Sequence, residues 1–139
     1  MKRTDWISTY CRVFCGISFL VHGTPKILNL NGAMESAAGV GLPEFAGVPI
    51  ALLEFFGGML LVVGLLVRWV APLLMVETLV SAVWVHGRMG WNVYEYGYEF
   101  ALALFLLLLT AWWLGPSPVS IDHRFGRGRK REEEEPALT

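Results

Sequence analysis

The segment VPIALLEFFGGMLLVVGLLV, residues 48–67, decides the fold class of this chain. It carries one charged side chain, Glu54, and has the ~20 residues that a helix needs to cross a bilayer core. The whole chain of 139 residues is 55% hydrophobic and 17% charged, with a mean hydropathy of +0.51. Soluble domains of this size rarely contain so much apolar material. The composition therefore predicts an integral membrane protein.

Three further apolar runs flank this segment. Pro25 discourages helical geometry at the preceding residue, and Gly115-Pro116 ends the last run. Arg68 interrupts the apolar residues at a tight turn, and a short helix is expected near residues 32–38. The pattern predicts an all-α, antiparallel bundle of four transmembrane helices in one domain, residues 1–122. The helices are expected at about 6–24, 48–67, 69–86 and 96–114.

The basic residues predict the orientation of this bundle. Eight Lys and Arg residues fall on the side of the two termini, and only Lys26 and Arg88 fall on the other. Because basic residues concentrate on the cytoplasmic side, both termini are predicted to be cytoplasmic and the location is the inner (plasma) membrane. Residues 123–139 carry a basic block and four consecutive glutamates, and predict a disordered tail. Contact of the basic block with anionic lipid or a partner is the alternative.

Each predicted helix carries one ionisable residue near its outer end. At a rise of ~1.5 Å per residue, these groups lie roughly 20–25 Å from the cytoplasmic end of their helices, which we take as the inner boundary of the membrane. They are His22, Glu54, His86 and Glu99, with Lys26, Arg88 and Tyr98 just above them. Charged groups in membrane spans are costly and often functional, so these residues are candidates for one site. The alternative is a set of solvated helix ends within an ordinary interfacial belt.

A second pair of charges lies deeper. Arg12 and Glu77 fall roughly 9 and 12 Å from the inner boundary, and we expect a structural ion pair between them. A proton-relay role for Glu77 is the alternative. Glu77 and His86 are nine residues apart, so a regular helix points them in opposite directions. They can share a pocket only if the helix distorts near Gly87.

The candidate residues include metal-ligating types. Two histidines and two glutamates suit iron, manganese or zinc, but the chain has no HxxxH or ExxH motif. We therefore predict no metal site. Bis-histidine haem between His22 and His86 is the remaining alternative, and the sequence does not favour it.

At this point a family resemblance is evident. The segment GISFLVHGTPK, residues 16–26, resembles the first-helix signature of the DoxX family. Four further matches follow in order: GLP at 41–43, EFFGG at 54–58 with GLLVR at 64–68, YE at 98–99, and GPSPVSID at 115–122. The resemblance covers residues 6–122 and implies a four-helix membrane protein. DoxX-like and DoxD-like proteins include a thiosulfate:quinone oxidoreductase subunit and members of complexes that handle thiols or oxidants.

The resemblance and the residues together lead to a functional hypothesis. We expect a membrane redox subunit that binds a quinone near the outer leaflet, with electrons entering from a partner protein or a soluble donor such as thiosulfate. Glu54 or Glu99 would exchange protons, and His22 or His86 would hydrogen-bond a carbonyl. Lys26, Arg88 and Tyr98 would contact the substrate. Other protein subunits or a second copy are the expected partners. The alternatives are a non-catalytic structural or assembly subunit and, less favoured without an internal repeat, a transporter.

Overall fold

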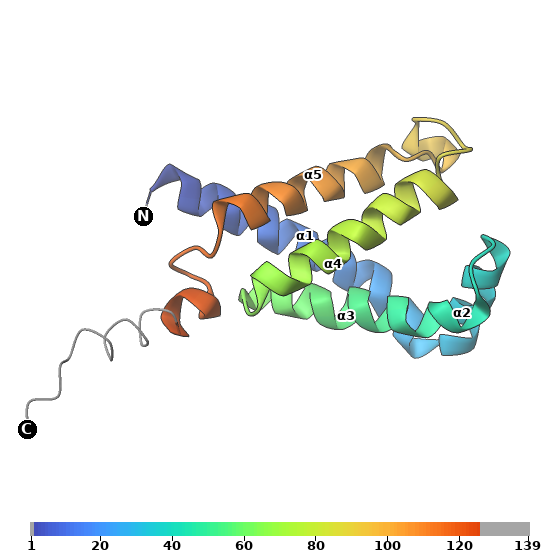
Figure 1. Ribbon diagram of the computed structural model, residues 1–139, viewed down its shortest axis with the longest axis horizontal. Helices are drawn as coiled ribbons and strands as arrows, with labels where there is room; N and C mark the ends of the chain where they lie inside the picture. Colours follow the sequence, from blue (N-terminus) through green and yellow to red (C-terminus); the bar gives the residue numbers. More distant parts are fainter. Residues whose placement is uncertain (1, 126–139) are drawn as a thin grey trace, which may run out of the picture.

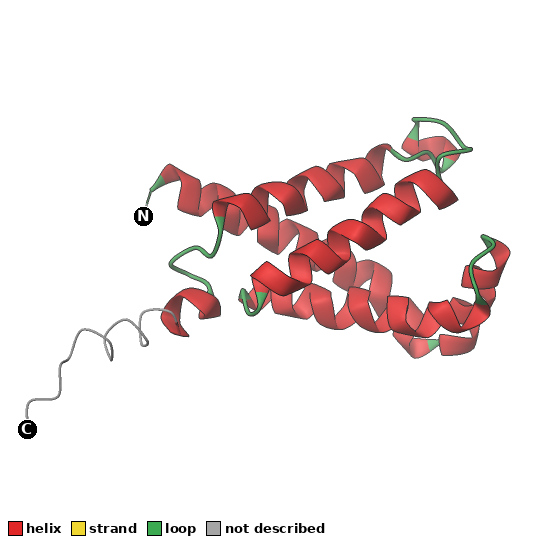
Figure 2. Ribbon diagram, in the orientation of Figure 1, coloured by secondary structure: helices red, strands yellow, loops and turns green. Residues whose placement is uncertain are grey.

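The computed structural model describes residues 2–125, and these residues form helices joined by turns and loops, with no strand among them (Figure 2). The all-α prediction is therefore confirmed for this part of the chain. The five α-helices are α1 (Arg3–Leu28), α2 (Leu30–Gly39), α3 (Gly47–Val63), α4 (Val67–Val80) and α5 (Glu99–Leu114). Shorter helical turns are η1 (Glu44–Ala46), the π-helical η2 (Ser81–Val85) and η3 (Val93–Glu95).

The four longest helices pack around one core. α1 contacts α3 and α5, and α4 contacts the same two helices. Phe19, Leu61, Leu74 and Leu108, one from each helix, are buried together at the centre. The start of α1, the α3–α4 turn and the end of α5 lie at one end of the molecule, with α2 and the loop before α5 at the other (Figure 1).

Helix α1 is longer than predicted. We expected it to end or kink at Thr24, but it continues through Pro25 to Leu28. A proline inside a helix removes one backbone hydrogen bond without necessarily ending the helix. The continuation has a consequence for function, because it places Lys26 one helical turn after His22 on the same face.

The turn between α3 and α4 comes earlier than Arg68, where it was predicted. Gly64 adopts a left-handed conformation (φ 73°) that ends α3, and Leu66 follows with φ 55°. Asp122 secures this turn from the far end of the chain. Its carboxylate accepts hydrogen bonds from the Leu66 and Val67 amides at 2.8 and 2.9 Å. Carboxylates are favoured at a helix start, where backbone N–H groups lack partners within the helix.

Helix α4 loses its regular geometry at its C-terminal end. The α-helical hydrogen bonding stops at Val80 and continues as the π-helical turn Ser81–Val85. Such a turn contains an extra residue, so it rotates the side chains that follow it. α5 then begins at Glu99 rather than at Tyr96, because residues 93–95 form a 3₁₀ turn.

The predicted ion pair between Arg12 and Glu77 is not formed. Arg12 is buried and donates hydrogen bonds from Nη1 to the carbonyl oxygens of Leu61 and Val62 at the end of α3, the second at 2.7 Å. Glu77 instead lines a pocket at the opposite end of the helices. A helix end leaves carbonyl groups without partners, and two of these accept hydrogen bonds from Nη1, whereas Nε of Arg12 is buried without a partner among the described residues.

Within residues 2–125, two segments are long and apolar enough to cross a membrane, residues 44–63 and 67–85. α1 and α2 form a pair bent by 107° that could make a third span, and α5 is a shorter apolar helix. Phe14, Leu52, Leu73 and Leu106, from four different helices, are strongly exposed. Apolar surface distributed in this way is suited to lipid contact. Of the predicted tail, residues 126–139 lie outside the described part of the chain, and residues 121–125 are helical.

Candidate functional site

All four long helices contribute to a pocket of about 270 Å³ near the end of the molecule that contains α2. We call it the polar pocket. Its ionisable members are His22 and Lys26 from α1, Glu54 from α3, Glu77 from α4, and His86 just after η2. The rest of its wall is formed by Phe19, Thr78, Ser81, Val93, Tyr96, Gly97, Phe100, Ala101 and Leu104. A small cavity lined by several convergent ionisable groups is typical of a ligand site.

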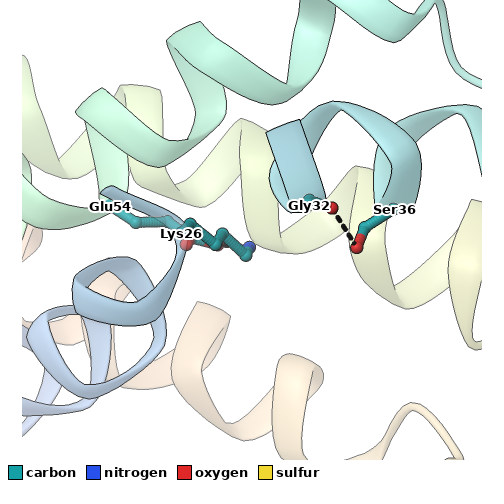
Figure 3. Close-up of polar contacts among 4 residues, drawn as sticks. All are labelled: Lys26, Gly32, Ser36 and Glu54. Carbon is teal, nitrogen blue, oxygen red and sulfur yellow. Dashed lines mark hydrogen bonds and ion pairs between the residues drawn. The ribbon is translucent and has the colours of Figure 1, made fainter. Parts of the chain in front are cut away.

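An ion pair joins α1 to α3 at the wall of this pocket. Lys26 Nζ lies 2.6 Å from Glu54 Oε1, and this is the only ion pair among residues 2–125. Figure 3 shows the two side chains together with α2 beside them. The second carboxylate oxygen, Oε2, is buried and makes no hydrogen bond within the described residues. This oxygen is fully covered by protein, so a ligand reaches it only when the side chains around it move.

The close approach of α1 to α3 makes this pair possible. A Cβ on Gly23 would lie 2.6 Å from the backbone nitrogen of Phe55 and 3.0 Å from Cβ of Glu54. No larger residue fits there without moving one helix. Gly23 therefore holds the two helices close enough for Lys26 to reach Glu54.

Glu77 brings a second carboxyl group to the same place. It lies close enough to Glu54 and Lys26 to interact electrostatically with both. One helical turn further along, Ser81 adds a hydroxyl group to the pocket wall. One ammonium group thus faces two carboxyl groups, which can exchange protons with a bound molecule.

His86 is oriented by a backbone contact. Its Nδ1 lies 2.6 Å from the carbonyl oxygen of Tyr96. A carbonyl oxygen can only accept, so Nδ1 carries the hydrogen and donates it. In the neutral ring, Nε2 is then a free acceptor. Tyr96 has a left-handed backbone (φ 61°), which is uncommon for a residue other than glycine.

His22 forms the other side of the pocket. Its ring packs against Phe100 of α5, with 5.8 Å between ring centroids. The residue is otherwise exposed, so the imidazole can reach both the pocket and its surroundings. Phe19 and Leu104 complete an apolar floor beneath the ionisable groups.

The structure assembles part of the predicted ring. His22, Lys26, Glu54 and His86 line one pocket, but Glu99, Arg88 and Tyr98 do not. Glu99 is the first residue of α5 and does not line the pocket. Arg88 lines a separate cavity with Trp84, and Tyr98 packs edge-to-face on Trp91.

Sequence reasoning missed Glu77 as a member of the site. Glu77 and His86 share the pocket although they are nine residues apart, because the π-helical turn distorts the helix between them. The spacing of Glu77 and Ser81, one helical turn, could have suggested a shared polar face. Within residues 2–125, no three His, Cys, Asp or Glu side chains are grouped so as to hold a metal ion.

The helices and pocket define a membrane protein with a polar site enclosed by its helix ends. The DoxX family model matches residues 8–87, more than half of the chain, and the protein belongs to this family. A Bacillus subtilis protein named "Putative oxidoreductase CatD" is 39% identical over 72 residues, which cover 52% of this chain and 53% of that protein.

Two Escherichia coli relatives match over most of their length. The inner membrane protein YqjF is 31% identical over 88% of this chain and 95% of its own, and the inner membrane protein YphA is 27% identical over 81% and 86%. No solved structure matches the chain. The protein is accordingly a multi-pass protein of the inner (plasma) membrane, in contact with the lipid bilayer.

Proposed function

We propose that this protein is a redox subunit that binds a quinone in the polar pocket. The observation that carries the proposal is the grouping of two carboxyl groups, one ammonium group and two imidazoles in one small cavity of a membrane protein. The similarity to a protein named as an oxidoreductase supports a redox role. Quinones dissolve in the bilayer, and their chemistry requires groups that transfer protons and bind oxygen atoms.

The pocket residues fit the proton balance of this reaction. Reduction of a quinone takes up two electrons and two protons, one proton on each oxygen. Glu77 donates one proton in this scheme, and the ionised Glu54 passes on a second proton that it takes from the Lys26 ammonium group. His86 Nε2 accepts a hydrogen bond from a quinol hydroxyl. Lys26 stabilises negative charge on a partly reduced oxygen. The electrons come from a partner protein or from a soluble donor.

The proposal includes the membrane topology. Four spans are formed by α1, α3, α4 and α5, with both termini cytoplasmic, in agreement with the distribution of Lys and Arg. Lys26 and Glu54 then lie toward the outer leaflet. α5 has 16 residues, roughly 24 Å of helix, which needs a locally thin bilayer or flanking residues to complete the span.

Purification in a mild detergent tests this function. Bound quinone is extracted and quantified, and an absorption spectrum is recorded on protein made in haem-replete cells. We expect quinone in the wild-type sample, and about tenfold weaker binding of added quinone in Glu54→Gln, which loses a charged contact. Glu35→Gln is the matched control, because Glu35 is an exposed carboxylate on α2. Equal binding by Glu54→Gln and wild type would contradict the proposed role, and a Soret band would favour haem.

Co-purification separates this function from a non-catalytic subunit. A stable isolated chain that supports quinone reduction favours the redox subunit. Recovery only within a large complex, whose activity is unchanged by Glu54→Gln, favours a structural or assembly role.

A further inference from the structure

A second cavity, of about 600 Å³, lies between α2, α3 and α4. We call it the apolar groove. Small residues of α2 and the loop that follows it form one wall, and aliphatic side chains of α3 and α4 form the other. Its apolar members are Ala33, Ala37, Val40, Leu42, Ala46, Gly47, Pro49, Ile50, Leu53, Leu73, Val76, Val80 and Val85. It is the larger of the two cavities that contain Lys26.

The groove and the polar pocket meet. Lys26, Glu77, Ser81 and His86 line both cavities. The polar pocket, at about 270 Å³, is at the lower limit of ligand sites, which are commonly ~300–1,000 Å³. It has room for a ring with a few polar substituents. Any longer molecule bound there would extend past these four shared residues into the groove.

The groove leads from the polar pocket toward the hydrocarbon region. It follows α4 and η2 from His86 back to Leu73, roughly 20 Å along the helix. Leu73, Val76 and Val80 on its wall are also strongly exposed on the outer surface. In a bilayer, exposed aliphatic side chains of this kind face lipid. The side of the groove formed by α4 is therefore open to the membrane.

The wall formed by α2 presents no side-chain hydroxyl group that needs a hydrogen bond from a bound molecule. The bend of 107° between α1 and α2 allows α2 to pack against α3. Ser36 is the hydroxyl-bearing residue on this wall, and its Oγ donates a 2.7 Å hydrogen bond to the Gly32 carbonyl within α2 (Figure 3). An apolar chain can lie against this surface without leaving a donor unsatisfied.

We propose that the substrate is a quinone with an isoprenoid tail, whose headgroup occupies the polar pocket and whose tail lies in the apolar groove. This inference rests on the proposed function. It adds the substrate class, a lipid-soluble quinone that enters sideways from the bilayer between α2 and α4, and it assigns the groove to the tail.

The test compares two quinones that share a headgroup. The protein in lipid nanodiscs is titrated with 2,3-dimethoxy-5-methyl-1,4-benzoquinone, either without a tail or with a tail of two isoprene units. Dissociation constants are obtained from the rise in the midpoint of thermal unfolding. The wild type is expected to bind the tailed quinone at least about tenfold more tightly, the gain expected from burying a few methylene groups.

Two substitutions on one helix isolate the groove. Val76→Trp narrows it, whereas Leu79→Trp adds the same side chain to an exposed position of α4 that does not line it. We expect Val76→Trp to abolish the advantage of the tail and to leave the tailless quinone within about twofold of wild type. Leu79→Trp should retain the advantage. The two quinones partition into the lipid equally in the samples of both variants, so partitioning does not affect the comparison of Val76→Trp with Leu79→Trp. Leu73→Trp is a second narrowing variant should Val76→Trp unfold.

The outcomes separate the two proposals. If the wild type binds both quinones equally, or if both narrowing variants keep the advantage of the tail, the groove assignment is wrong and the headgroup site stands. If neither quinone binds, the proposed function itself fails. A phospholipid retained by the wild type and lost from Val76→Trp, with no advantage for the tailed quinone, would overturn the inference and make the groove a lipid site.

Discussion

Lys26→Met is expected to destabilise the protein more than Glu54→Gln, although both break the same ion pair. The Glu54 side chain is 5% exposed and that of Lys26 is 36% exposed. Removal of Lys26 leaves a buried carboxylate without its partner. Neutralising Glu54 leaves an ammonium group that water can reach. Loss of one partner from a fully buried pair costs about 3–5 kcal/mol, and exposed pairs contribute about 0–1 kcal/mol. We expect about 3 kcal/mol for Lys26→Met and about 1 kcal/mol for Glu54→Gln.

A double-mutant cycle measures this asymmetry. The free energy of unfolding is obtained by SDS titration in mixed micelles for the wild type, both single variants and the double variant. The double variant should be close to Glu54→Gln, because neither position 26 nor position 54 then carries a charge. The coupling energy then has a magnitude of about 3 kcal/mol, well above the ~0.5 kcal/mol scatter of additive sites. Glu35→Gln, an exposed position on α2, should change the unfolding free energy little.

Equal costs for the two single variants would refute this reasoning, since burial would then not control the energy of the pair. A coupling energy below about 0.5 kcal/mol would show that Lys26 and Glu54 do not interact in the membrane protein. Either result would also remove the basis for placing Lys26 against a quinone oxygen.

Three other substitutions test separate parts of the structure by thermal unfolding. Asp122→Ala removes the two hydrogen bonds at the start of α4 and should cost about 1–2 kcal/mol; an unchanged midpoint would show that the turn does not depend on them. Gly23→Ala places a Cβ against the α3 backbone and should cost about 1–3 kcal/mol, whereas Gly39→Ala, with open space around it, should be near neutral. The unfolding free-energy changes of Arg12→Met and Glu77→Gln should be additive within about 0.5 kcal/mol, because the two side chains form no ion pair in the structure. A larger coupling energy would show that Arg12 and Glu77 do interact.

The helical class and the approximate helix positions could be predicted from the sequence because they follow from apolar run length. Val48 to Val67 was recognisable by composition alone, and the structure has a helix at Gly47–Val63 there. The turn after it was placed at Arg68, the most conspicuous polar residue. The structure turns at Gly64, where a positive φ is required. The prediction relied on the position of the charged residue, whereas the turn is determined by the backbone conformation of Gly64.

The heights of residues along the predicted helices identified four of the pocket residues, but this reasoning also assigned Glu99 to the site and omitted Glu77. The height of a residue along a helix does not show in which direction its side chain points around the helix axis. Glu99 has the correct height but does not line the pocket, and Glu77 lies lower but lines it. Rotation depends on interruptions of the helix, and the π-helical turn Ser81–Val85 carries no clear sequence signal. Such turns form where tertiary packing compensates for poorer hydrogen bonding.

Three unusual backbone features lie around the polar pocket. Pro25 lies within α1 next to Lys26, the π-helical turn lies between Glu77 and His86, and Tyr96 has a positive φ where its carbonyl orients His86. Each departure costs free energy relative to a regular helix or turn. With regular α-helical geometry after Val80, His86 would point away from Glu77. The same irregularities that reduce the stability of the helices therefore assemble the pocket, which is the arrangement expected of a functional site.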